Sequence, residues 1–109
     1  MMDRATTFSA LAEPNRLRIV DLLAGGSLSV GEIAERLELR QPQASKHLRV
    51  LLDAGLVKVE AEANRRNYEL RIEPLKELDE WLERYRRIWN ERYDNLEQYL
   101  QQLQAKPKE

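Results

Sequence analysis

Cysteine is absent from the 109-residue chain, and histidine occurs only once. Without thiols the chain has no disulfides, thiolate metal sites or cysteine nucleophiles, and one imidazole provides no converging set of metal ligands. The four glycines form no phosphate-binding loop, and serine, histidine and aspartate show no triad motif. We therefore expect neither an enzyme nor a protein that holds a metal or a cofactor.

Long apolar runs are also missing. No run approaches the roughly 20 residues that a membrane span needs, and the opening residues Met1-Met2-Asp3-Arg4 lack a signal-peptide pattern. The lack of cysteine fits a reducing compartment. The length suits one domain with its own core. We therefore expect a soluble, cytoplasmic protein with no membrane partner, in which residues 1–104 form the domain and residues 105–109 a disordered tail.

Neither sign of charge dominates the whole chain, because the formal net charge is −1 and the sequence pI is about 5.9. This balance counts against nucleic-acid binding, but the charges are unevenly distributed. Residues 36–50 carry four basic side chains and one acidic, a net of +3, whereas residues 73–103 carry five basic and eight acidic, a net of −3. The pattern is compatible with phosphate contact by one surface only.

Four helices are predicted in the first half of the chain. Residues 3–12 and 14–24 form the first two candidates. A third begins near Val30, because the tetrapeptide at 29–32 matches a capping box, and a fourth covers about residues 42–54. Two short helices joined by a tight turn, the second with a polar outer face, are typical of a helix-turn-helix.

The fourth helix has an aliphatic inner face and a polar outer face. Its aliphatic positions recur at helical spacing, and its polar side chains are long enough to reach base edges or phosphates. The DNA-binding candidates are Gln41, Gln43, Ser45, Lys46, His47 and Arg49. An ordinary amphipathic helix with a solvated polar face is the alternative. His47 itself stays open between base or phosphate contact, packing within the helix-turn-helix, and a ligand or catalytic role.

A β-hairpin is predicted after this helix, over about residues 56–72. The two ends of this segment alternate apolar and polar residues, and Asn64 between them suits a left-handed turn conformation. A hairpin that follows a recognition helix is the wing of a winged helix. Arg65 and Arg66 near its tip are candidates for entering a minor groove or gripping phosphate, and solubilising tip charges are the alternative.

The last segment, about residues 74–104, predicts one long helix with an apolar stripe. About 31 residues make a rod of about 46 Å, longer than the diameter of about 26 Å expected for a small domain. The stripe therefore needs a partner, either a second copy in a two-fold dimer that also uses the first helix, or a different protein. Candidate dimer-interface residues are Phe8, Leu78, Leu82, Tyr85, Trp89 and Leu96. Trp81, Tyr85 and Trp89 could instead line a pocket for an apolar effector, although an aromatic stripe at helical spacing is more often core or interface, and the sequence identifies no effector.

Together these segments resemble the ArsR or SmtB-type winged helix-turn-helix repressors of bacteria. The similarity covers about residues 10–70. It is carried by Leu11-Ala12-Glu13-Pro14-Asn15-Arg16, Ile19-Val20-Asp21-Leu22-Leu23, Leu28-Ser29-Val30-Gly31-Glu32-Ile33-Ala34, Gln41-Pro42-Gln43-Ala44-Ser45-Lys46-His47-Leu48 and Ala54-Gly55-Leu56-Val57. The C-terminal part is similar to a metal-independent subgroup with a long final helix.

The resemblance implies a homodimer that places one recognition helix per subunit in successive major grooves. By analogy Gln41, Gln43, Ser45 and His47 correspond to base-reading positions, with Lys46 and Arg49 nearer phosphate. Metal-sensing members carry cysteines in the third helix, or histidine and aspartate pairs in the final helix. This chain has no cysteine in the third helix and no histidine in the final one, so known metal sites of these kinds cannot be built.

Two positions depart from the family pattern. Arg40 stands where many relatives have a serine that caps the recognition helix, so the cap is weaker here or is formed by Gln41, and Arg40 becomes a candidate for phosphate contact. Ala63-Asn64 replaces the Gly-Arg pair that is common at the wing turn.

The sequence therefore predicts a mainly α fold with a small β-hairpin, a winged helix-turn-helix dimerised through its N-terminal and long C-terminal helices. The expected function is sequence-specific regulation of transcription, with a homodimer repressing by binding a dyad-symmetric operator in double-stranded DNA. The alternative is a protein-interaction module that uses the winged domain and the long helix without DNA binding.

Overall fold

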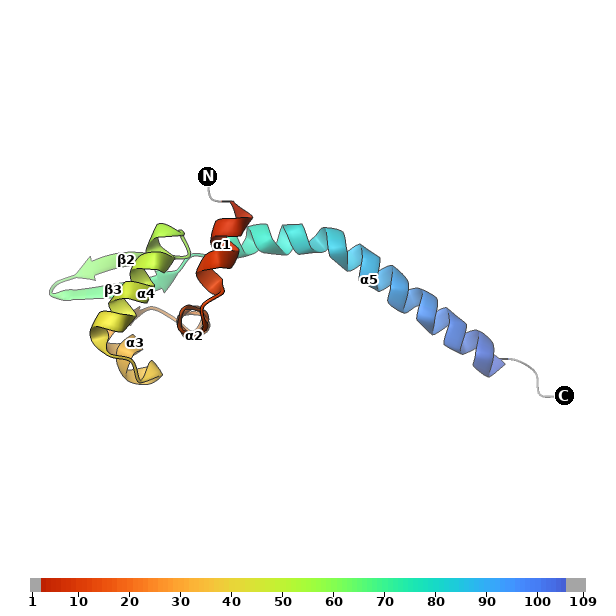
Figure 1. The fold of residues 1–109 in the computed structure, drawn as a ribbon, viewed down its shortest axis with the longest axis horizontal. Helices are drawn as coiled ribbons and strands as arrows, with labels where there is room; N and C mark the ends of the chain where they lie inside the picture. Colours follow the sequence, from red (N-terminus) through yellow and green to blue (C-terminus); the bar gives the residue numbers. More distant parts are fainter. Residues whose placement is uncertain (1–2, 106–109) are drawn as a thin grey trace. The chain divides into compact units, whose positions relative to one another are not determined.

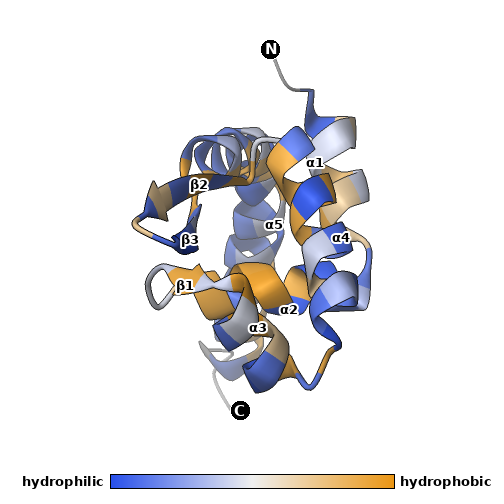
Figure 2. Ribbon diagram, turned by 90° about the vertical axis from the view of Figure 1, so that its left-hand side faces the viewer, coloured by the Kyte–Doolittle hydropathy of each residue, from blue (hydrophilic) through white to orange (hydrophobic). Residues whose placement is uncertain are grey.

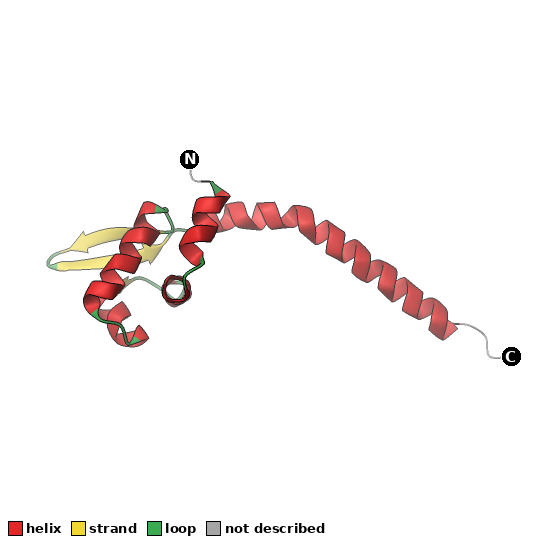
Figure 3. Cartoon of the chain, viewed as in Figure 1, coloured by secondary structure: helices red, strands yellow, loops and turns green. Residues whose placement is uncertain are grey.

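The computed structural model describes residues 3–105, which form five helices and three strands (Figures 1 and 3). In chain order these are α1 (Arg4–Leu11), α2 (Pro14–Leu23), β1 (Leu28–Ser29), α3 (Val30–Leu37), α4 (Gln41–Asp53), β2 (Val57–Glu62), β3 (Arg65–Leu70) and α5 (Glu73–Ala105). The chain divides into two compact units, the first ending at Glu77 and the second beginning at Leu78. The predicted mainly helical, winged helix-turn-helix class is confirmed.

Side-chain caps begin the first three helices. Asp3 accepts a hydrogen bond from the Thr6 amide at 2.7 Å at the start of α1, and the hydrogen bonds from the Thr6 backbone and side chain hold the pKa of the Asp3 carboxyl below its usual value. Glu13 caps α2 in the same way. At α3 the predicted capping box is present, because the Ser29 hydroxyl accepts from the Glu32 amide at 3.2 Å and the Glu32 carboxylate accepts from the Ser29 amide at 3.1 Å.

The turn between α3 and α4 is built without a serine cap. Glu38 ends α3 in the left-handed conformation, with φ of 57°. Arg40 occupies the N-cap position of α4, but its guanidinium carries no acceptor and caps no amide. Instead the Gln43 side-chain oxygen accepts from the Arg40 amide at 3.2 Å. The predicted weaker cap is therefore present, and the alternative in which Gln41 forms it is wrong.

The sheet has three antiparallel strands in the order β1-β3-β2, one more than the predicted hairpin. The additional strand pairs Leu28 with Tyr68 and Ser29 with Asn67, so it joins the wing to the start of α3. The prediction for the wing turn was also wrong in one detail. Ala63, not Asn64, takes the left-handed conformation, with φ of 53°.

The core of the first unit holds the inner face of α4 in place. Six side chains are almost completely buried: Ile19, Ile33, Leu48, Leu51, Leu56 and Val57. Leu48 and Leu51 come from α4, and the others come from α2, α3 and the start of the wing. In Figure 2 the hydrophobic colour gathers on α2, α3 and β1, whereas β2 and β3 are largely hydrophilic. The recognition-helix candidate is thereby fixed by its aliphatic face, and its polar face stays outside the core.

Helix α5 spans 33 residues, or about 50 Å. Leu75 in its first turn packs against the core of the first unit. Farther along, Leu78 and Trp81 are half-buried, and the large apolar side chains from Leu82 onward are exposed. No helix within residues 3–105 is long and apolar enough to cross a membrane. Of the predicted disordered tail, Ala105 is the last residue of α5, and residues 106–109 lie outside the described residues.

Candidate nucleic-acid interface

The outer face of α4 presents most of the DNA-binding candidates together. Gln41, Gln43, Ser45, Lys46 and Arg49 are all exposed. Arg40 immediately before the helix is exposed as well. Beneath them Ala44 and Leu48 are completely buried. The helix therefore offers amide, hydroxyl and cationic groups on one side, which is the chemistry that reads base edges and contacts phosphates.

The cations on this face are available for an anionic partner. Within residues 3–105, neither Arg40 nor Lys46 makes an ion pair through its side chain. Arg49 lies 3.4 Å from Asp53 one turn along, but both side chains are at least two-thirds exposed. Such a surface pair contributes little free energy and is easily exchanged for a phosphate.

Gln43 is positioned by its contact with the helix start. Because its oxygen accepts from the Arg40 amide, the side-chain NH₂ remains as the group that can donate outward. This contact was not anticipated from the sequence, where Gln43 appeared only as a base-reading candidate. It ties the orientation of one polar side chain to the geometry of the turn.

His47 is separated from the exposed group. Its side chain is only 19% exposed, and Nδ1 lies 3.6 Å from the Glu13 carboxylate at the start of α2. That nitrogen is buried and has no hydrogen-bond partner among the described residues. The geometry favours packing within the helix-turn-helix, one of the interpretations that the sequence left open, over direct contact with DNA.

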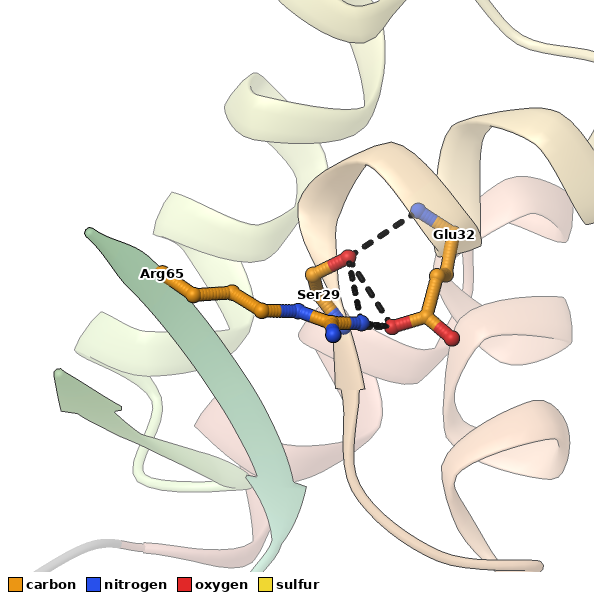
Figure 4. A network of polar contacts seen from close by, with 3 residues as sticks. All are labelled: Ser29, Glu32 and Arg65. Atoms are coloured by element: carbon orange, nitrogen blue, oxygen red, sulfur yellow. Dashed lines mark hydrogen bonds and ion pairs between the residues drawn. The ribbon is translucent and has the colours of Figure 1, made fainter. Parts of the chain in front are cut away.

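The two wing arginines have different surroundings. Both belong to the start of β3 and not to the turn itself, which is Ala63-Asn64. The Arg65 guanidinium forms an ion pair with the Glu32 carboxylate and approaches the Ser29 hydroxyl at 3.4 Å, so it joins the α3 capping box (Figure 4). Arg66 is exposed and makes no ion pair with any described residue. Of the two, Arg66 is the one that has no ion pair to exchange before it meets a phosphate.

Because of this difference, replacing Arg66 with alanine should affect DNA binding, whereas replacing Arg65 with alanine should affect stability. Arg66→Ala should lower affinity for all DNA sequences and reduce the slope of log affinity against log salt by about 1, because one phosphate contact is lost. Arg65→Ala should instead lower the free energy of unfolding by about 0.5–1 kcal/mol, because a largely exposed ion pair contributes little. Fluorescence anisotropy over a salt series and urea denaturation measure the two effects. Equal salt slopes for both variants would contradict the assignment.

The dimer-interface candidates are apolar side chains that one chain leaves exposed. Phe8 on α1 is 42% exposed, and on α5 Leu82, Tyr85, Trp89 and Leu96 are between 37% and 52% exposed. Leu78 is half-buried. No described residues form a group of three or more histidine, cysteine, aspartate or glutamate side chains that could hold a metal ion.

Comparisons with known proteins agree with this geometry. Residues 11–60, which run from the end of α1 into β2, match a family described as a helix-turn-helix domain. The chain is 32% identical over 75 residues to the transcriptional repressor SdpR of Bacillus subtilis, an alignment that covers 69% of this chain and 83% of SdpR. It spans between 56% and 66% of the length of three other curated relatives.

Solved structures of ArsR-like regulators have a similar fold. An ArsR-like transcriptional regulator from Rhodococcus sp. RHA1 superimposes with a TM-score of 0.71 at 27% identity, covering 88% of this chain and 91% of that one. The homodimeric winged helix-turn-helix DNA-binding domain of a possible ArsR-family regulator from Mycobacterium bovis gives a TM-score of 0.63 at 34% identity, covering 72% and 73%.

The three-stranded wing, the buried inner face of α4 and its exposed polar face define a winged helix-turn-helix protein of the kind that regulates transcription. Within that class, the chain belongs to the ArsR family.

Proposed function

We propose that the protein is a transcriptional repressor that binds a dyad-symmetric operator as a homodimer and has no metal-sensing site. One α4 helix from each subunit would enter successive major grooves, about 34–36 Å apart along the duplex. The wing would lie alongside, with Arg66 near the phosphates. The observation that supports this most directly is the single exposed face of α4, where amides, a hydroxyl and unpaired cations lie together above a completely buried Leu48.

The direct test is a titration of the purified protein against DNA from upstream of its own gene, with a shuffled duplex of the same composition as the control. We expect a salt-sensitive shift that is at least a thousandfold tighter for the cognate DNA, since specific binding typically exceeds non-specific binding by that factor or more. Footprinting of the same DNA should reveal two symmetric half-sites. A reporter fused to that promoter should become more active when the protein is removed, and lower activity would identify an activator instead.

Base reading by α4 can be tested at one position. Gln43→Ala should relax the preference for one base pair in each half-site at a cost of about 1–3 kcal/mol, because its NH₂ group would no longer donate to a base edge. Selection from a randomised operator library measures the preference. Asn15→Ala, on α2 outside the α4 face, is a matched control that should leave the preference unchanged. An unaltered preference in Gln43→Ala would remove Gln43 from the base-reading set.

If no salt-sensitive binding occurs at micromolar protein, a protein-interaction module becomes the better description. The long helix α5 would then be the surface that recruits a partner. Dimer formation without DNA binding would favour that outcome.

A further inference from the structure

The ion pair between Glu32 and Arg65 joins the helix-turn-helix to the wing (Figure 4). Glu32 lies in the first turn of α3, and Arg65 is the first residue of β3. In Figure 4 the Arg65 side chain points from the wing toward Ser29 and Glu32. The contact therefore links two parts of the proposed DNA-binding region that are 33 positions apart in the sequence.

The Glu32 carboxylate is held in place by the helix start as well as by Arg65. It accepts hydrogen bonds from the Ser29 amide at 3.1 Å and from the Ser29 hydroxyl at 3.0 Å. The Arg65 guanidinium donates to the same Ser29 hydroxyl at 3.4 Å, so it has two acceptors at this point. A carboxylate whose rotamer is already fixed loses little further entropy when it pairs with a cation. Glu32 is therefore a pre-organised partner for Arg65.

The register of the sheet directs Arg65 toward the start of α3. Strand β1 places Ser29 opposite Asn67 of β3. Arg65 is two residues before Asn67, and alternate residues of a strand point to the same face. Glu62 lies opposite Arg65 on β2, but it is exposed and forms no ion pair within residues 3–105. The guanidinium thus pairs with the distant Glu32 and not with the acidic residue across the hairpin.

This ion pair is less exposed than the one on α4. The side chains of Arg65 and Glu32 are 57% and 36% exposed, whereas those of Arg49 and Asp53 are 75% and 67% exposed. Salt screens a partly buried pair less than a fully solvated one. A phosphate therefore displaces Asp53 from Arg49 more easily than it displaces Glu32 from Arg65.

We propose that Glu32 limits the affinity for DNA by withholding the Arg65 guanidinium from phosphates. When the second helix of a helix-turn-helix enters the major groove, the first helix crosses the DNA backbone. Helix α3 is that first helix, so a guanidinium beside its start lies where phosphates would pass. With Arg65 held by Glu32, the wing contributes one phosphate contact, through Arg66, in place of two. This inference rests on the DNA binding of the proposed function and names a residue that sets its strength.

Glu32→Gln in the full-length chain tests the proposal, because glutamine retains the capping box and removes the charge. Fluorescence anisotropy over a salt series would be measured on the footprinted operator and on the shuffled duplex. With Arg65 released to a phosphate, the slope of log affinity against log salt should steepen by about 0.9 on both duplexes. The affinity of the variant relative to the unmodified chain should thus rise about 3.5-fold as salt is lowered from about 200 to about 50 mM. The double variant Glu32→Gln/Arg65→Ala should return to the unmodified slope.

Glu35→Gln is the matched control. Glu35 is exposed on the same helix and forms no ion pair with the residues that the structure describes. The control removes the same charge without releasing an arginine, so its slope should stay close to that of the unmodified chain. The thermal transition of each variant verifies that the winged domain is folded.

Three results would overturn the proposal while DNA binding itself stands. Equal slopes for Glu32→Gln and Glu35→Gln would mean that no cation is released. A steeper slope that persists in the double variant would assign the gain to a group other than Arg65. Weaker binding by Glu32→Gln, or a gain on the operator alone, would mean that the ion pair positions the wing or that Arg65 contacts a base. If the unmodified chain shows no salt-sensitive binding, the proposed function fails and this inference fails with it.

Discussion

Trp89→Glu is expected to convert the dimer into a monomer and to reduce operator affinity by a factor on the order of 10² to 10³. The substitution places two negative charges, one from each copy, among the exposed apolar side chains of α5. An unpaired charge in such an interface costs about 3–5 kcal/mol, and a monomer engages only one half-site. Light scattering measures the mass, and anisotropy on the footprinted operator measures the affinity.

The substitution should leave the first unit folded, because Trp89 is 42% exposed in a single chain and belongs to the second unit. The thermal transition of the winged domain therefore separates loss of dimer from loss of fold. Gln98→Glu is the matched control, since it adds a glutamate to the same exposed helix on the opposite face. A Trp89→Glu protein that remains dimeric would place the interface elsewhere, and a Gln98→Glu protein that dissociates would show that charge alone is responsible.

Local chemistry explains why most of the helices could be predicted from the sequence. The capping box of α3 requires only two residues three positions apart, and both of its hydrogen bonds are present. The end of α4 and the length of α5 follow equally from short-range patterns, since a glycine stops one helix and an apolar stripe continues in the other. Such features depend on neighbours within one or two turns, which the sequence states directly.

Features that depend on distant residues could not be predicted in the same way. Strand β1 has only two residues, too few for an alternating pattern, and it exists because β3 supplies its hydrogen bonds from nearly forty residues away. The left-handed turn of the wing falls on Ala63, a residue whose side chain gives no reason to expect it. In both cases the pairing of the strands, and not the local sequence, determines the backbone.

In the candidate site, too, features set by neighbouring residues could be predicted and contacts between distant residues could not. The exposed face of α4 followed from helical spacing, but the spacing does not say which polar residue lies at the border with the core. His47 packs near Glu13, and Arg65 pairs with Glu32, 33 positions away in the sequence. These contacts could have been anticipated from Glu13 at the start of α2 and Glu32 at the start of α3. Besides capping its own helix, each carboxylate lies beside a cationic or imidazole side chain that is distant in the sequence.

The largest loss of stability is expected from Leu48→Ala, which should lower the free energy of unfolding by about 2–5 kcal/mol. Leu48 lies on the inner face of α4, is completely buried and belongs to the same core as Ile33 and Leu56. Its removal leaves a cavity under the residues that are proposed to read DNA, so operator affinity should fall even at temperatures where the protein remains folded. Val50→Ala is the control on the same helix, because Val50 is 40% exposed and its truncation should cost less than about 1 kcal/mol. Urea denaturation of both variants measures the difference, and equal losses would mean that α4 is not anchored through Leu48.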